Sequence, residues 1–162
     1  NRHRTPYPRV QETNPTRNMT HPRINIRTAV AEHLKQTFAN TYTSRSKPLF
    51  DQDLPAVLVY TGTETIKEER WDTDGHGDLT RELELFVEAV DTGKDDLDEK
   101  LDTMAEQLET MLDGGDVPKM RNAVLRFKTT ETDMSIDGAK IYGAIRLGFT
   151  LTYMTKTHNN DD

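Results

Sequence analysis

The amino-acid sequence predicts an α+β fold, with two helices packed on one face of a mostly antiparallel sheet and an extended N-terminal arm. Three observations indicate this class. Two segments repeat apolar residues at helical spacing, and several others alternate apolar and polar residues as half-buried strands do. The expected order along the chain is helix, three strands, helix, two strands. Helices that do not alternate regularly with strands favour an antiparallel sheet covered on one side.

Residues 1–23 are expected to form a flexible, basic, proline-rich arm. They hold four of the seven prolines and five arginines against Glu12, a net charge of +4, so the rest of the chain carries −11 of the total of −7. So few aliphatic residues cannot offset the entropy lost on ordering. We expect one α+β domain at residues 24–155 and a frayed polar tail at residues 156–162.

The composition narrows the classes of function. Hydrophobic residues make up only 33% of 162 residues, so the core is thin for this length. Either part of the chain lies outside the core, or part of the stability comes from association with other subunits. Cysteine is absent, which excludes disulfides and thiolate metal sites. No apolar run approaches the roughly 20 residues needed to span a membrane, and we expect no membrane partner. The acidic body argues against groove-type DNA binding. Solubility is the favoured explanation of this acidity, and a surface that DNA passes without sticking is the alternative.

The first helix is predicted to begin after Asn25, a suitable N-cap. Ile26, Val30, Leu34 and Phe38 recur at spacings of four, which predicts one apolar stripe that packs on the sheet. His33 lies beside this stripe. We interpret it as a residue at the boundary of the core, because no second metal ligand lies nearby in the sequence.

Two strands and a loop are expected next. Tyr42–Ser44 is a candidate short strand, and Arg45–Asp53, with a proline inside, predicts a loop. Pro55–Thr61 contains an unbroken apolar run rich in β-branched residues. Because proline is tolerated at the start of a strand, this segment predicts a buried strand.

A charged hairpin is predicted from Glu64 to Asp78, with its tip near Gly75 and Gly77. The returning strand is expected at Leu79–Val90. Its apolar residues occupy one face by strict alternation: Leu83, Leu85, Val87 and Ala89.

The second helix is predicted after Asp95 or Asp96 and before Gly114-Gly115, which end it. Its apolar residues follow the helical repeat: Leu97, Leu101, Met104, Ala105, Leu108, Met111 and Leu112. The methionines are interpreted as core residues rather than as part of a cofactor site.

Two further strands complete the expected sheet. Alternation predicts a strand at Ala123–Lys128, a polar loop at Thr130–Gly138, and a long strand at Ala139–Tyr153. The last strand is long for a small domain, so we expect it to be central.

The segment that contains Asp72, Asp74, His76 and Asp78 is the only candidate metal site in the sequence. Asp72 and Asp74, two apart and followed by Gly75, resemble the start of a calcium loop, but the twelfth position is Leu83 rather than the closing glutamate. A hairpin tip rich in Asp and Gly needs no metal. No metal is therefore expected, with a cation held by the three aspartates as the alternative.

We expect no catalytic residues and no cofactor. The sequence has no cysteine and no serine flanked by glycines as in a nucleophile elbow. It also has no phosphate-binding loop and no dinucleotide fingerprint.

An ordered set of residues resembles the tail-terminator family of lambda-like long-tailed phages (minor tail protein U). The resemblance runs from about residue 27 to 153. It is carried by Arg27-Thr28-Ala29-Val30, Phe50-Asp51, Pro55-Ala56-Val57, Val59-Tyr60, Asp72, Asp74, Glu82-Leu83, Val87, Leu147, Phe149, Leu151 and Thr152-Tyr153. Residues 1–23 have no counterpart in the family.

The resemblance implies a structural virion protein. Members form a homohexameric ring on the last ring of the tail tube, end tube polymerisation at the length that the tape measure sets, and offer the opposite face to the head connector. The implied partners are other copies of the chain, the tail-tube protein, the head–tail connector protein and the tape-measure protein. DNA would pass through the lumen without specific binding. The implied location is the head-proximal end of the tail, after assembly in the host cytoplasm.

The interfaces are expected to use residues that the fold does not need. These lie in the Glu64–Asp78 hairpin, the Arg45–Asp53 loop and the outer face of the second helix. The candidate interface residues are Arg45, Lys47, Glu68, Glu69, Arg70, Trp71, Asp72 and Asp74, and the candidate contacts of the N-terminal arm are Arg2, Arg4, Arg9 and Arg17.

Three alternatives stay open at the level of sequence. The chain could be a tail-tube or head-completion connector subunit, a monomeric adaptor that docks through its basic arm, or an unrecognised metal-dependent enzyme. Ring formation separates the first of these from the other two. Binding of tube ends without polymerisation separates a terminator from a tube subunit.

Overall fold

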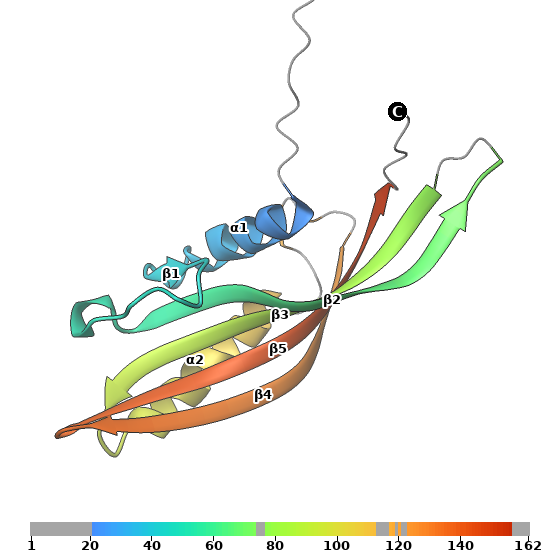
Figure 1. Cartoon of the computed structure of the whole chain (residues 1–162). Helices are drawn as coiled ribbons and strands as arrows, with labels where there is room; N and C mark the ends of the chain where they lie inside the picture. The colour runs from blue at the N-terminus through green and yellow to red at the C-terminus, as the bar shows by residue number, and fades with distance from the viewer. Residues whose placement is uncertain (1–20, 74–76, 113–116, 119, 121–122, 157–162) are drawn as a thin grey trace, which may run out of the picture.

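The computed structural model describes residues 21–73, 77–112, 117–118, 120 and 123–156, and it confirms the α+β class (Figure 1). The strands form one sheet in the order β1-β2-β3-β5-β4. The short β1 runs parallel to β2, and every other neighbouring pair is antiparallel. The elements are α1 (Pro22–Leu34), β1 (Thr41–Tyr42), a 3-10 turn (Asp51–Asp53), β2 (Ala56–Trp71), β3 (Gly77–Gly93), α2 (Leu97–Leu112), β4 (Val124–Asp137) and β5 (Lys140–Lys156).

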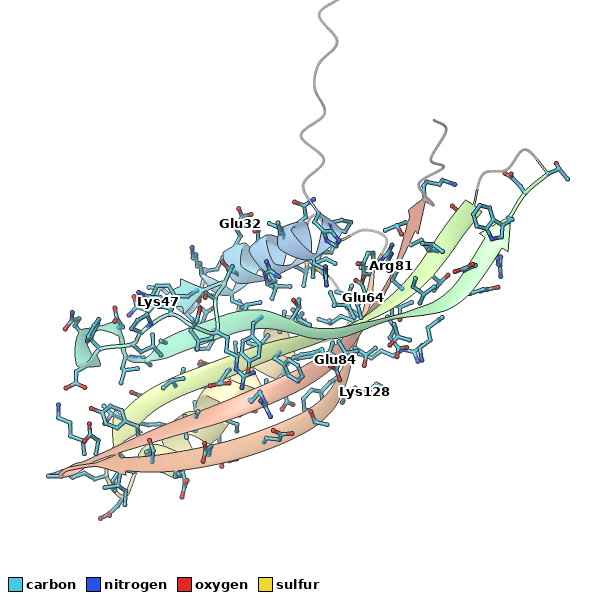
Figure 2. All side chains as sticks on the ribbon, in the orientation of Figure 1. Glu32, Lys47, Glu64, Arg81, Glu84 and Lys128 are labelled. Carbon is cyan, nitrogen blue, oxygen red and sulfur yellow. The ribbon has the colours of Figure 1, made fainter. Side chains whose placement is uncertain are left out.

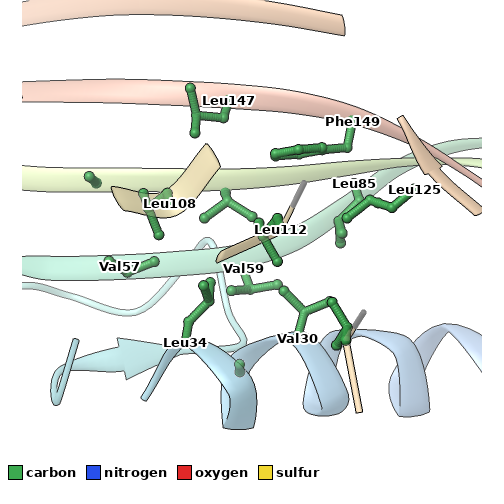
Figure 3. Close-up of a cluster of buried hydrophobic side chains, with 14 of the residues drawn as sticks. Val30, Leu34, Val57, Val59, Leu85, Leu108, Leu112, Leu125, Leu147 and Phe149 are labelled. Atoms are coloured by element: carbon green, nitrogen blue, oxygen red, sulfur yellow. The ribbon is translucent and has the colours of Figure 1, made fainter. Parts of the chain in front are cut away.

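One hydrophobic core lies between the sheet and both helices (Figure 3). The alternation expected for β3 is confirmed, because Leu83, Leu85, Val87 and Ala89 are all fully buried. β5 pairs with β3 in unbroken register and adds a second buried row beside the first: Ile145, Leu147, Phe149 and Leu151. We call the side of the sheet on which these rows lie the helix side, and the opposite side the helix-free side.

The first helix begins earlier than the sequence suggested. α1 starts at Pro22, and the ring nitrogen of His21 accepts a hydrogen bond from the backbone N–H of Arg23 at 3.2 Å. Asn25 is therefore inside the helix and is not its cap. Proline is favoured at the first helical position because its missing N–H would lack a helical partner there. The sequence prediction assigned Pro22 to the proline-rich N-terminal arm and therefore placed the start of the helix too late.

His33 lies at the contact between the two helices. Its Nε2 is 2.9 Å from the carbonyl oxygen of Met111, near the end of α2. This agrees with the interpretation of His33 as a boundary residue.

Two strands extend through segments that were not expected to be their continuation. β2 continues through the charged residues to Trp71, and residues 130–137 of the expected Thr130–Gly138 loop form the second half of β4. The chain turns between β4 and β5 at Gly138, where a φ of 61° favours glycine. In both extensions most side chains are exposed on both faces, so the hydrophobic alternation that marks a strand is missing.

Beyond the helices, β2 and β3 extend as a hairpin that projects from the body, with the end of β5 beside it (Figure 1). We define the projecting hairpin as Ile66–Trp71 of β2 and Gly77–Arg81 of β3. The predicted hairpin is thus confirmed, although its expected tip at Gly75 lies outside the described residues.

The register is irregular only in the outer pairs of the long strands. The β2–β3 pair is interrupted between Thr61 and Glu64 and between Ile66 and Glu68, and the β4–β5 pair between Phe127 and Thr129. The inner pair, β3 with β5, has no such interruption over the described residues. β5 has a strand partner on each side and is an interior strand, but β3 rather than β5 occupies the centre of the order.

Within the described parts of the chain, neither helix has the length and apolar character needed to cross a membrane.

Candidate assembly surfaces

The projecting hairpin exposes the side chains that the sequence nominated for an interface. Trp71 is 60% exposed, and Ile66 on the same strand is 47% exposed. Arg70 lies 2.8 Å from Glu68, and this hydrogen bond raises the pKa of the guanidinium. Glu69 and Asp72 are also exposed. The hairpin therefore presents an indole among charged groups.

The base of the hairpin is held by a network that the sequence did not reveal. The carboxylate of Glu64 accepts hydrogen bonds from Arg81, at 2.7 Å, and from the hydroxyl of Tyr153. Arg81 also donates to Thr155 at 2.8 Å. Figure 2 places Glu64 and Arg81 where the hairpin leaves the helix-covered part of the sheet. Glu64 is therefore a partly buried group that bonds within its own subunit, although the sequence placed it in the exposed charged segment.

Burial and hydrogen bonding together shift the pKa values of this network. Burial alone would raise the pKa of Glu64, but the hydrogen bonds from Tyr153 and Arg81 outweigh it and hold the pKa below its ordinary value of 4.5. Burial and the bond to Glu64 raise the pKa of Tyr153. The carboxylate is therefore charged and bonded at neutral pH, and it joins β2 to β3 and β5 at the base of the hairpin.

The Arg45–Asp53 loop lies against the helix-free side of the sheet. Arg45 stacks over the ring of Tyr60 at 5.3 Å, and Lys47 over the ring of Tyr42 at 4.4 Å. The carboxylate of Asp51 accepts a hydrogen bond from Tyr142 at 2.9 Å and pairs with Lys140 at the start of β5. Hydrogen bonds lower the pKa of Asp51, and the bond from Lys140 contributes more than the bond from Tyr142. Both nominated cations thus contact aromatic rings of their own subunit.

Aromatic and charged groups also interlock on the helix-free side. The hydroxyl of Tyr60 donates to Glu88 at 2.7 Å, and its ring lies 5.5 Å from that of Phe86. The guanidinium of Arg146 lies 5.2 Å above Phe86 and pairs with Glu131. These contacts cross four strands, so they brace the uncovered side of the sheet.

Strand β4 carries exposed apolar side chains that the sequence prediction missed. Phe127, Met134 and Ile136 are 45%, 41% and 76% exposed. Met134 and Ile136 are visible in the sequence, but they fall in the segment expected to be a loop. As a strand, that segment turns the two side chains onto the same side of the sheet.

The remaining candidates fall partly outside the structure. Arg2, Arg4, Arg9, Arg17 and Asp74 lie outside the described residues. Asp78 lies 2.6 Å from the ammonium group of Lys156, which makes it an ion-pair partner. Within the described ranges, no three histidine, cysteine or acidic residues are grouped as a metal site would require.

Two comparisons with known proteins found similarity. The sequence pattern of one family, described as phage minor tail protein U, matches residues 20–153. A solved chain described as part of the virion of a native gene transfer agent (GTA) particle has a similar fold, with a TM-score of 0.55 and 15% sequence identity. The similarity covers 84% of this chain and 100% of that one. No curated protein matches the sequence.

Proposed function

Because this chain belongs to the phage minor tail protein U family, we propose that it forms a ring that caps the head-proximal end of a phage tail tube. At the coarser level the chain is a structural protein of a phage tail and a component of the virion. The observation that carries the proposal is the extent of the family match, which spans residues 20–153 and so includes both helices and nearly all of the sheet.

The proposed ring has two tasks. One face seats on the last ring of tail-tube protein and ends polymerisation, and the other face meets the head connector. DNA passes through the lumen. The charge of −11 outside residues 1–23 supports passage without tight binding, because a nucleic-acid site needs cations to neutralise phosphates.

The projecting hairpin is the proposed docking element of the ring. Its exposed indole supports this role, because tryptophan is enriched among the residues that dominate binding energy at protein interfaces. The network of Glu64, Arg81 and Tyr153 supports it further, since a hairpin anchored at its base loses less freedom on binding. Arg45 and Lys47 remain proposed interface residues at the rim of the helix-free side.

Imaging of the purified protein, alone and with isolated tail tubes, tests this function. We expect rings on one end of each tube, and six chains of 18.5 kDa give a ring of about 111 kDa by light scattering. Tubes that lengthen when the protein is added would instead identify a tube subunit. A monomer that never decorates a tube end would overturn the ring.

A further inference from the structure

Strand β4 is an open edge of the sheet. It pairs with β5 along Val124–Asp137, and no described strand pairs with its other side. Its unpaired backbone groups form a template on which another strand can align. An open edge of 14 residues is long for a monomeric protein.

Three of the four exposed large apolar residues in the described β4 lie on the helix side of this edge, and Val124 lies on the helix-free side. Phe127 pairs with Phe149, and Met134 and Ile136 pair with Gly143 and Ile141 of β5. Phe149 is buried in the core, and a side chain at Gly143 would meet Leu101 of α2. We call Phe127, Met134 and Ile136 the β4 apolar row.

α2 leaves most of the β4 apolar row uncovered. The helix packs over β3 and β5, and Leu125 is the buried apolar residue of β4. Next to it, a hollow of about 240 Å³ opens between α2 and β4, lined in part by Glu106, Thr110 and Phe127. The floor of this hollow is thus apolar, and α2 provides its polar rim.

The opposite edge of the sheet is open as well. β1 pairs only with Val57 and Leu58, so the outer part of β2 has a strand partner on one side alone. Ile66 and Trp71 pair with Arg81 and Gly77, which belong to the alternate set of β3 that faces the helix side. Both edges therefore expose apolar side chains on the same side of the sheet.

The directions of the strands allow these edges to meet in two copies. The four long strands alternate in direction from β2 to β4, so β2 of a second copy placed beside β4 continues the antiparallel pattern. The open part of β2 lies toward the projecting hairpin, and β4 reaches toward the other end of the sheet. Such an offset produces the stagger that tilted strands need when a sheet closes on itself.

We propose that the open edge of β2 in one copy pairs with β4 of the next, so that Ile66 and Trp71 pack on the β4 apolar row. The occupant of the row is thus a second copy of this chain. The interface is head-to-tail, and repetition of such a contact forms a ring when the rotation between copies closes on itself. On the helix-free side, Arg70 of β2 and Asp133 of β4 supply opposite charges. The proposal rests on the ring function proposed above and assigns the contact between its subunits.

Pairs of introduced cysteines test this contact. Because the chain has no cysteine of its own, every disulfide that forms must join introduced residues. Within one copy, β3 and β5 separate β2 from β4 by about 14 Å, twice the span of a disulfide, so a disulfide between the edges must join two copies. We would combine Ile66→Cys in turn with Thr130→Cys, Thr132→Cys, Met134→Cys and Ile136→Cys, which all lie on the helix side. Ile66→Cys with Ser135→Cys, on the opposite side of β4, is the matched control.

We expect at least one of the four pairs to give a ladder of covalent oligomers under oxidation, and the Ser135→Cys control to give none. A second test compares Ile136→Glu with Val124→Glu, since both replace an exposed apolar residue of β4 but on opposite sides. Ile136→Glu should weaken self-association about tenfold or more and Val124→Glu should not, with equal melting temperatures.

The outcomes separate this proposal from the function. Rings on tube ends without any ladder, or with equal effects of the two glutamates, overturn the edge contact and leave the ring standing. A protein that forms no ring with tubes and no ladder overturns both.

Discussion

Trp71 is a large apolar side chain that the subunit does not use for its own core, since 60% of its surface is exposed. We therefore expect Trp71→Ala to weaken assembly by about 2 kcal/mol, because an indole that becomes buried at an interface contributes on that scale. Sedimentation or light scattering over a dilution series measures the loss.

The melting temperature of the same variant provides the control. It should change little, because few contacts of the free subunit are removed. A similar loss of folding stability and assembly would mean that Trp71 packs within its own subunit.

Glu64 gives the second prediction at the scale of single residues. Glu64→Gln should lower the free energy of unfolding by about 1–3 kcal/mol at pH 7, because the partly buried guanidinium of Arg81 loses its charged partner. Urea denaturation measures the change. Glu69→Gln removes an exposed carboxylate from the same hairpin and should have little effect.

The pH dependence of Glu64 has a definite sign. Its native pKa lies below 4.5, so the unfolded chain takes up the proton first as the pH falls. The stabilisation is therefore complete above about pH 5 and is lost as the pH falls toward the native pKa. Stability that falls equally steeply in Glu64→Gln over this range would contradict the assignment.

At the scale of elements, the Arg45–Asp53 loop is joined to β5 by the bonds of Asp51 to Lys140 and Tyr142. We expect Asp51→Asn to speed hydrogen exchange in this loop while the amides of β3 and β5 exchange as before, because the core does not depend on an exposed pair. Acidification should have the same local effect, because the bonds of Asp51 stabilise the loop only while its carboxylate is ionised. Since the pKa of Asp51 is lowered, this stabilisation is lost only as the pH falls through that lowered pKa. Exchange followed by mass spectrometry resolves the two regions, and Glu106→Gln on α2 is a control.

The elements that the sequence predicted best are those with one buried face. β3 and α2 carry regular apolar patterns because their other faces meet solvent, and α2 spans the expected Leu97–Leu112. The outer half of β2 and the second half of β4 lack such a pattern. Their strand structure comes from hydrogen bonds to a neighbouring strand, which periodicity does not record.

The same contrast between local sequence patterns and contacts across strands explains which parts of the candidate assembly surfaces the sequence predicted. The exposure of Trp71 follows from its charged neighbours, and the sequence predicted it. The Glu64 network joins residues 17 and 89 positions apart, so only the pairing of β2, β3 and β5 brings them together. The β4 apolar row escaped notice because two of its residues were placed in a loop.

At the scale of the whole molecule, the sequence joins a basic N-terminal segment to an acidic body. Residues 1–20 hold four arginines against one glutamate, a net charge of +3, and α1 begins at Pro22. Deletion of residues 1–20 should leave the fold and the ring intact but weaken joining of heads to tails, because it removes the attraction to adjacent acidic subunits.

Salt provides the second readout for this deletion. Added salt should weaken joining by the intact protein more than by the shortened one, since exposed charges are screened within about 8 Å at physiological ionic strength. Equal joining by both proteins would show that the segment makes no contribution.

The interruptions of register in β2 and β4 bear on how unassembled subunits survive in a crowded cell. Both lie in strands with an open side, whereas the interior β3–β5 pair runs without a break. A bulge bends and twists a strand, so a flat strand from an unrelated chain cannot align along it. The irregular edges therefore hinder amyloid-like stacking of flat strands, whereas a strand of matching curvature can still align along them.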